Sequence, residues 1–213
     1  MQFNSSEIEI GRKFFAGNAI YLTSATSKDN LPKPEFNEIA FIGRSNVGKS
    51  SIINALTNRK KLANFSKTPG RTRQLNFFKI ENKEQQLILV DLPGYGYAKV
   101  TKKDIQNWYK LTNFYFYERV NLRTVCLLVD ARRDVSKDDK SMINFLDEIG
   151  LSWTLILTKV DKLKKSDLIK KKSDMKEIIN KSSAAFPFIF MTSSIKKIGF
   201  EDLRAYISSF SIN

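Results

Sequence analysis

One stretch of this sequence decides its expected fold: residues 43–50 read Gly43-Arg44-Ser45-Asn46-Val47-Gly48-Lys49-Ser50. The stretch matches the pattern G-x-x-x-x-G-K-[ST] at every fixed position. Its two glycines let the backbone wrap closely around a phosphate group, and successive N–H groups then point inward at the anion. The pattern therefore predicts a loop that binds a nucleoside triphosphate, without saying which one. The alternative is a chance match on an ordinary turn between a strand and a helix.

The flanking sequence favours the phosphate loop. The apolar run 38–42 is typical of a buried strand that ends at Gly43, and the apolar spacing in 49–58 is typical of a helix. The start of that helix adds a favourable dipole end for phosphates. Lys49 is then expected to bridge the β and γ phosphates as a catalytic charge, and Ser50 to bind Mg²⁺ through its hydroxyl.

Strand-like runs alternate with helical patterns along the rest of the chain. The strand-like runs are 74–80, 86–91, 124–130, 153–158 and 188–192, and the helical patterns are 102–119, 137–148, 166–181 and 200–209. This alternation predicts a three-layer α/β fold, with a mostly parallel sheet flanked by helices. We expect one domain over residues 1–213, with a core at about 37–210 and an N-terminal extension, 1–36. Pro32 and Pro34 predict a turn or an extended entry into the core.

Two loops are placed to sense the γ-phosphate. Asp91 ends an apolar strand and begins the run Asp91-Leu92-Pro93-Gly94, where the carboxylate can hold Mg²⁺ through water and Gly94 can offer its N–H to the phosphate. Upstream, the loop Thr68-Pro69-Gly70-Arg71-Thr72 carries a threonine that can close on the metal and the γ-phosphate and release them after hydrolysis. We assign that role to Thr72, with Thr68 as the alternative.

The base is predicted from a third loop, Thr158-Lys159-Val160-Asp161, directly after the strand-like run 153–158. A carboxylate at Asp161 accepts hydrogen bonds from the guanine ring N–H and the exocyclic amine together, whereas adenine would leave it unpaired. Lys159 is expected to lay its alkyl stem over the base. The run Thr192-Ser193-Ser194 follows the last strand and supplies a backbone N–H for the guanine O6. The sequence therefore predicts GTP rather than ATP, and Asp161 argues against a P-loop kinase or ATPase.

Composition limits the remaining choices. The chain has no histidine, which excludes a histidine base, a histidine metal ligand and a Ser-His-Asp triad. Its single cysteine, Cys126, fits a reducing compartment, and no apolar run is long enough to cross a membrane, so we expect a cytoplasmic protein. A formal net charge of +14 favours polyanionic partners, either nucleic acid or an anionic membrane surface.

With these motifs, the chain closely resembles the EngB (YihA/YsxC-type) family of bacterial ribosome-assembly GTPases, from about Phe15 to Ile207. The runs that carry the resemblance are 43–51, 68–72, Asp91-Leu92-Pro93-Gly94-Tyr95-Gly96-Tyr97-Ala98 and Thr158-Lys159-Val160-Asp161-Lys162. In the last run, threonine replaces the asparagine that is usual in other GTPases.

The resemblance implies a six-stranded, mostly parallel sheet and a role in maturation of the large ribosomal subunit, and thereby in cell growth and division. It implies that Ser50 and Thr72 are magnesium ligands. It also implies a GTP site over the matching residues, namely Gly43, Arg44, Ser45, Asn46, Val47, Gly48, Lys49, Ser50, Ser51, Gly70, Arg71, Thr72, Asp91, Gly94, Thr158, Lys159, Asp161, Lys162, Thr192, Ser193 and Ser194. We expect a monomer whose partners are GTP, GDP and the large subunit or its precursor.

The residue that follows Gly94 bears on hydrolysis. Ras-type GTPases place a water-orienting glutamine there, but this chain has Tyr95, so we predict slow intrinsic turnover. Asn46 is a candidate to hold K⁺, which would supply positive charge where an arginine finger would lie, or it stabilises the loop backbone alone. The other source of stimulation is a partner that completes the site.

A basic segment follows the guanine loop. Eight lysines (Lys162, Lys164, Lys165, Lys170, Lys171, Lys172, Lys176 and Lys181) stand against three acidic residues in this segment, Asp167, Asp174 and Glu177. They form either a solvated helix face or a footprint for RNA phosphates. A GTPase of the same superfamily that acts in RNA modification or at a membrane stays an alternative to ribosome assembly.

Overall fold

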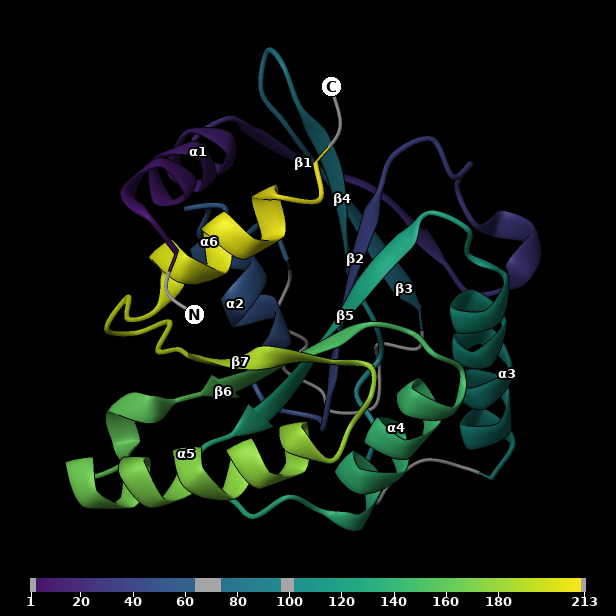
Figure 1. Ribbon diagram of the computed structural model, residues 1–213. Coiled ribbons are helices and arrows are strands. Elements are labelled where there is room, and N and C mark those ends of the chain that lie inside the picture. Colours follow the sequence, from purple (N-terminus) through teal and green to yellow (C-terminus); the bar gives the residue numbers. More distant parts are fainter. Residues whose placement is uncertain (1–2, 64–73, 97–101, 212–213) are drawn as a thin grey trace.

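The computed structural model describes residues 3–63, 74–96 and 102–211 (Figure 1). Its helices are α1 (Ser5–Phe15), α2 (Lys49–Leu56), α3 (Lys102–Glu118), α4 (Lys137–Glu148), α5 (Lys165–Asn180) and α6 (Phe200–Ser208). Its strands are β1 (Asn18–Ala25), β2 (Glu38–Gly43), β3 (Leu75–Glu81), β4 (Gln86–Asp91), β5 (Leu122–Asp130), β6 (Trp153–Thr158) and β7 (Ala185–Met191). Short 3-10 turns span Lys28–Asn30 and Val160–Lys162.

These strands form one sheet in the order β1-β3-β4-β2-β5-β6-β7. Strand β2 pairs in parallel with β4 and β5, and the parallel ladder continues through β6 to β7. Strand β3 pairs antiparallel with β4 on one side and with β1 on the other. The sheet is therefore mostly parallel, and the predicted α/β fold class is confirmed.

The sheet has seven strands over the described residues, whereas the family resemblance implied six. The seventh is β1, which pairs with β3 from Asn18 opposite Glu81 to Ala25 opposite Leu75. Residues 1–36, expected as an N-terminal extension, supply both β1 and helix α1. That helix begins at a capping box, in which the Asn4 side chain accepts from the Glu7 N–H and the Glu7 carboxylate accepts from the Asn4 N–H.

Helices cover both faces of the sheet (Figure 1). Residues of α3, α4 and α5 join one buried apolar cluster, and residues of α1, α2 and α6 join the other. Strand β2 is buried at all six positions, and its side chains alternate between the two clusters, with Ala40 and Ile42 on one face and Ile39 and Phe41 on the other.

The parallel strands place the functional loops together. Strands β2, β4, β5, β6 and β7 point the same way, so the loops that follow Gly43, Asp91, Asp130, Thr158 and Met191 meet at one edge of the sheet. Ligands of α/β sheets bind at this carboxyl edge. No helix in the part of the chain that the structure describes is both long and apolar enough to span a membrane.

Candidate nucleotide-binding site

The predicted phosphate loop lies between the end of β2 and the start of α2. Asn46 and Gly48 take left-handed backbone conformations, with φ of 65° and 113°. Gly48 is the N-cap of α2 and carries no side chain that could cap the first turn, which leaves the N–H groups of Lys49, Ser50 and Ser51 directed at the loop. The local backbone therefore has the form of an anion cradle at a helix N-terminus.

The first glycine of the loop is required by close packing. A Cβ added at Gly43 would lie 2.6 Å from the backbone oxygen of Leu128 in the neighbouring strand β5. A Cβ added at Gly94 would similarly lie 2.9 Å from the Ser45 nitrogen. The loop after β4 is thus pressed against the phosphate loop, and the Ser45 N–H donates to the Tyr95 carbonyl at 3.0 Å.

Asp91, Lys49 and Ser50 meet beside the cradle. The Ser50 hydroxyl donates to Asp91 Oδ2 at 3.1 Å, and Lys49 Nζ lies 3.9 Å from Asp91 Oδ1. Burial raises the pKa of Asp91, although Lys49 and Ser50 act against that shift. Asp91 Oδ1 is buried without a hydrogen-bond partner among the described residues. An unsatisfied carboxylate oxygen next to a hydroxyl is a donor set that fits a hard divalent cation or its bound water.

Tyr95, at the position of the missing glutamine, is fixed away from this group. Its hydroxyl donates to Asp139 Oδ1 at 2.6 Å, and its ring is 8% exposed and packs edge-on against Trp108. Asp139 also accepts from the backbone N–H and the hydroxyl of Ser136 at the start of α4. Tyr95 therefore joins the loop after β4 to α3 and α4.

The predicted base loop is tied directly to the phosphate loop. The Thr158 hydroxyl donates to the Val47 carbonyl at 2.8 Å, so the threonine at this position braces the two loops. Lys159 has a left-handed φ of 58°, and its Nζ donates to the Asn46 carbonyl at 2.8 Å.

The residues proposed to recognise guanine also lie together. The Ser193 hydroxyl donates to Asp161 Oδ1 at 2.6 Å, and Lys162 Nζ lies 3.6 Å from Asp161 Oδ2. The hydrogen bond from Ser193 is the main cause that lowers the pKa of Asp161. Thr192 is buried and bonds back to Leu157 O, which fixes the loop that carries Ser193 and Ser194. An ionised carboxylate at Asp161 is the kind of acceptor that the N–H groups of a guanine edge require.

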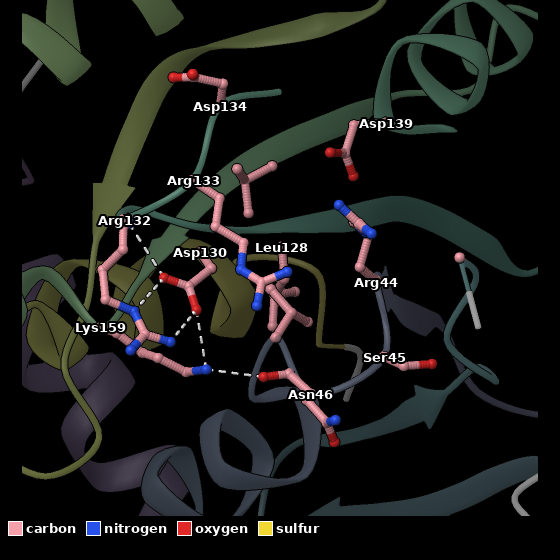
Figure 2. Close-up of a pocket in the computed structure, with 13 residues that line it drawn as sticks. Arg44, Ser45, Asn46, Leu128, Asp130, Arg132, Arg133, Asp134, Asp139 and Lys159 are labelled. Atoms are coloured by element: carbon pink, nitrogen blue, oxygen red, sulfur yellow. Dashed lines mark hydrogen bonds and ion pairs between the residues drawn. The ribbon is translucent and has the colours of Figure 1, made fainter. Parts of the chain in front are cut away.

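Sequence reasoning missed Asp130 as a member of this constellation. Asp130 Oδ2 lies 3.0 Å from Lys159 Nζ, and Arg132 donates to both carboxylate oxygens (Figure 2). The three side chains contribute to the wall of a cleft of about 340 Å³ between the phosphate loop and the end of β5. An aspartate at a strand end, with two arginines close behind it in the run Asp130-Ala131-Arg132-Arg133, was the available signal.

The structure thus brings together the residues from Gly43 to Ser51 with Asp91, Gly94, Thr158, Lys159, Asp161, Lys162, Thr192, Ser193 and Ser194. All five residues of the predicted sensing loop, Thr68-Pro69-Gly70-Arg71-Thr72, lie outside the described residues, as do Tyr97 and Ala98 of the family's run.

Comparisons with known proteins identify the family of this chain. A family model described as 50S ribosome-binding GTPase matches residues 38–159. A probable GTP-binding protein EngB from Hyphomonas neptunium is 44% identical over 212 residues, which cover 99% of this chain and 96% of the relative. The corresponding protein from Caulobacter vibrioides is 42% identical over 205 residues, covering 96% and 88%.

Solved structures support the fold alone. A bacterial selenocysteine-specific elongation factor superposes with a TM-score of 0.62 at 18% identity, over 82% of this chain and 28% of that protein. The Y63A variant of Era from Aquifex aeolicus, bound to GDP·AlF4⁻, gives a TM-score of 0.61 at 19% identity, over 83% of this chain and 57% of that protein. The family match and the full-length relatives decide identity: the chain belongs to the EngB family of GTP-binding proteins and is a GTPase.

Proposed function

We propose that this GTPase is a switch needed for assembly of the large ribosomal subunit, and that it affects cell growth and division through ribosome supply. The observation that carries the proposal is an exposed lysine face directly after the guanine loop. Of the eight lysines between Lys162 and Lys181, seven are exposed. Lys171 pairs with Asp134 at 3.1 Å, and Lys162 pairs with Asp161 at 3.6 Å. Such a face, next to the nucleotide, fits the phosphates of ribosomal RNA.

The family description as a 50S ribosome-binding GTPase supports the same partner. We propose that the protein acts in the cytoplasm as a monomer, with GTP, GDP and the large subunit or its precursor as its partners.

Nucleotide binding is assigned to the residues of the sequence prediction. Ser50 and Thr72 would hold Mg²⁺ directly and Asp91 through water, and the unsatisfied Asp91 Oδ1 supports that placement. When bound, the metal would neutralise charge on the β and γ phosphates. Lys49 would place its ammonium between the same phosphates, and Thr72 would close over them. Lys159 and Asp161 would hold the base, the first on its face and the second on its edge.

Slow intrinsic hydrolysis follows from the position of Tyr95. Because its hydroxyl is held by Asp139 and its ring by Trp108, it offers no group for orienting the attacking water. Two sources could supply the missing catalytic charge: K⁺ held at the exposed Asn46 side chain, or a group from the pre-ribosome.

Single-turnover hydrolysis by the pure protein, measured in K⁺ and in Na⁺, tests both points. A slow rate in Na⁺ is expected, and a faster rate in K⁺ that is lost in Asn46→Ala would assign the charge to Asn46. Equal slow rates in both salts would assign the missing catalytic charge to a group from the partner. A rate in Na⁺ as fast as that of a fully activated GTPase would contradict the claim that Tyr95 makes intrinsic hydrolysis slow.

Co-sedimentation with ribosomal subunits tests the proposed partner. The protein is loaded with a non-hydrolysable GTP analogue, with GDP, or with no nucleotide, and is centrifuged with purified large and small subunits. Binding to the large subunit or its precursor with the analogue alone is the expected result. Nucleotide-independent binding, or none by protein shown to bind GTP, would refute the switch while leaving the GTPase assignment intact.

A further inference from the structure

Asp130 is a buried carboxylate at the end of β5, next to the Lys159 side chain that we propose to lie over the base. It is 8% exposed, and its Oδ2 lies 3.0 Å from Lys159 Nζ. The same nitrogen donates to the Asn46 carbonyl at 2.8 Å, so the ammonium is held between a carboxylate and the phosphate loop (Figure 2).

Arg132 fixes the orientation of this carboxylate. Its Nε donates to Asp130 Oδ1 at 2.9 Å and its Nη2 to Oδ2 at 2.7 Å, and the Arg132 backbone N–H donates to Oδ1 at 3.1 Å. A bidentate pair of this kind fixes the plane of the carboxylate and favours its ionised form. Partial burial alone would raise the pKa of Asp130, but the hydrogen bonds from Arg132 and Lys159 lower it below its usual value. The carboxylate is therefore ionised and oriented before any ligand arrives.

Lys159 needs such support. Its backbone is in the left-handed region, which a lysine seldom adopts, and one third of its side chain is exposed. A long, partly exposed lysine side chain has many rotamers of similar energy unless its end is held. Because Lys159 Nζ is held by both the Asn46 carbonyl and the Asp130 carboxylate, its alkyl chain is restricted to one conformation.

We infer that Asp130, clamped by Arg132, is a positioning residue that holds Lys159 against the face of the nucleotide base. The inference rests on the proposed place of Lys159 over the base. It assigns Asp130 no contact with the nucleotide, since its oxygens are occupied by Arg132 and Lys159.

A distinctive consequence follows for different bases. The stem of Lys159 would touch the ring face, which guanine and hypoxanthine share, whereas Asp161 would read the edge, where hypoxanthine lacks the amine. Loss of Asp130 should therefore weaken the binding of GDP and IDP by the same factor. A change that displaced Asp161 would instead weaken the binding of GDP and of IDP by different factors.

The test is the dissociation rate of fluorescent GDP and IDP from the full-length protein. We expect Asp130→Ala to accelerate release of both by roughly ten-fold, which corresponds to ~1.4 kcal/mol. Asp130→Asn should have a smaller effect, because the amide oxygen still accepts from Lys159. Asp134→Ala is the matched control: it removes an aspartate from the same loop that pairs with Lys171 and points away from Asp130, so release should not change (Figure 2).

A double-mutant cycle separates positioning from general loosening of the fold. In a Lys159→Ala background, Asp130→Ala should add less than about two-fold to the release rate. An undiminished effect in that background, or different factors for GDP and IDP, would overturn the inference. If Lys159→Ala accelerates release and Asp130→Ala does not, only the role of Asp130 fails. If Lys159→Ala itself has no effect, the proposed base site fails with it.

Discussion

At the scale of single residues, Asp91 is a buried carboxylate whose charge is only partly compensated by its neighbours. The residue is 6% exposed, and one carboxylate oxygen lacks a hydrogen-bond partner among the described residues. Burial raises its pKa because the charged form loses hydration that Lys49 and Ser50 only partly replace. The residue is thus unfavourable for the fold without ligand and suited to a cation.

Asp91→Asn should therefore stabilise the nucleotide-free protein at pH 7 by a few degrees in melting temperature. A carboxyl whose pKa is raised by folding binds its proton more tightly in the folded chain, so its contribution to stability is greatest below about pH 4 and falls as pH rises through the raised pKa. Asparagine does not titrate, and the advantage of the variant should shrink as pH approaches 4. Thermal melts between pH 4 and 8 measure it.

The same variant should weaken Mg²⁺-dependent GTP binding by roughly 10–100-fold, the effect typical of groups that hold a metal through an intermediate ligand. Asp174→Asn, on the exposed face of α5, is the control and should change neither property. Equal or lower stability of Asp91→Asn at pH 7 would contradict the account.

The residue scale also separates what sequence could predict from what it could not. The Asp161–Ser193 pair was expected to lie at one site, because each follows a parallel strand and such strands end at a common edge. Asp130 is the last residue of a parallel strand, but its partner Lys159 was already assigned to the base. Residues that support a functional side chain without touching the ligand show no characteristic spacing in the sequence. The bidentate contact between Arg132 and Asp130 is therefore seen only in the structure.

At the scale of elements, α3 is joined to the sheet by a buried ion pair. Arg119, just after α3, is 7% exposed and donates from Nε to both oxygens of Glu38 at 3.0 Å, and Glu38, the first residue of β2, is 1% exposed. The Tyr115 hydroxyl donates to Glu38 at 2.8 Å, and Arg119 also donates to the Pro32 carbonyl. The network links α3, β2 and the N-terminal segment.

Arg119→Met should lower the free energy of unfolding by ~3–5 kcal/mol, because it leaves the Glu38 charge buried and unpaired. Adding Glu38→Gln should recover much of the loss, since the amide still accepts from Tyr115 and carries no charge. Chemical denaturation measures both variants. Arg12→Met, which breaks an exposed pair with Glu9 in α1, should leave the free energy of unfolding nearly unchanged. A double variant less stable than Arg119→Met would show that the unpaired charge is not the cause.

Element prediction succeeded where hydrophobic periodicity was strong. The bounds of β4, β6 and α4 match the sequence prediction, since each has a clear apolar pattern. β7 begins at Ala185 rather than 188 and contains Pro187, which an edge strand tolerates because one side of its backbone has no ladder partner. β1 was missed because it is an edge strand, exposed at four of eight positions, with no alternation to mark a buried face.

At the scale of the whole molecule, a net charge of +14 has two readings, a diffuse attraction to any polyanion or a local footprint on α5. Salt dependence distinguishes them. Each phosphate contact made by a lysine releases condensed counterions and adds about 0.7–0.9 to the slope of log affinity against log salt. A diffuse field depends on total charge, whereas a footprint depends on which lysines contribute it.

Two triple variants with the same loss of charge provide the comparison. Lys165, Lys172 and Lys176 are exposed on α5 at intervals that place them along one helix face, and Lys13, Lys33 and Lys83 are exposed on other elements. If α5 contacts RNA phosphates, replacing the first three by alanine should reduce the slope for binding to the large subunit by roughly 2, while replacing the second three leaves it near the wild-type value. Equal reductions would show that the charge acts as a diffuse field, and the lysine face on α5 would then lose its place in the proposed function.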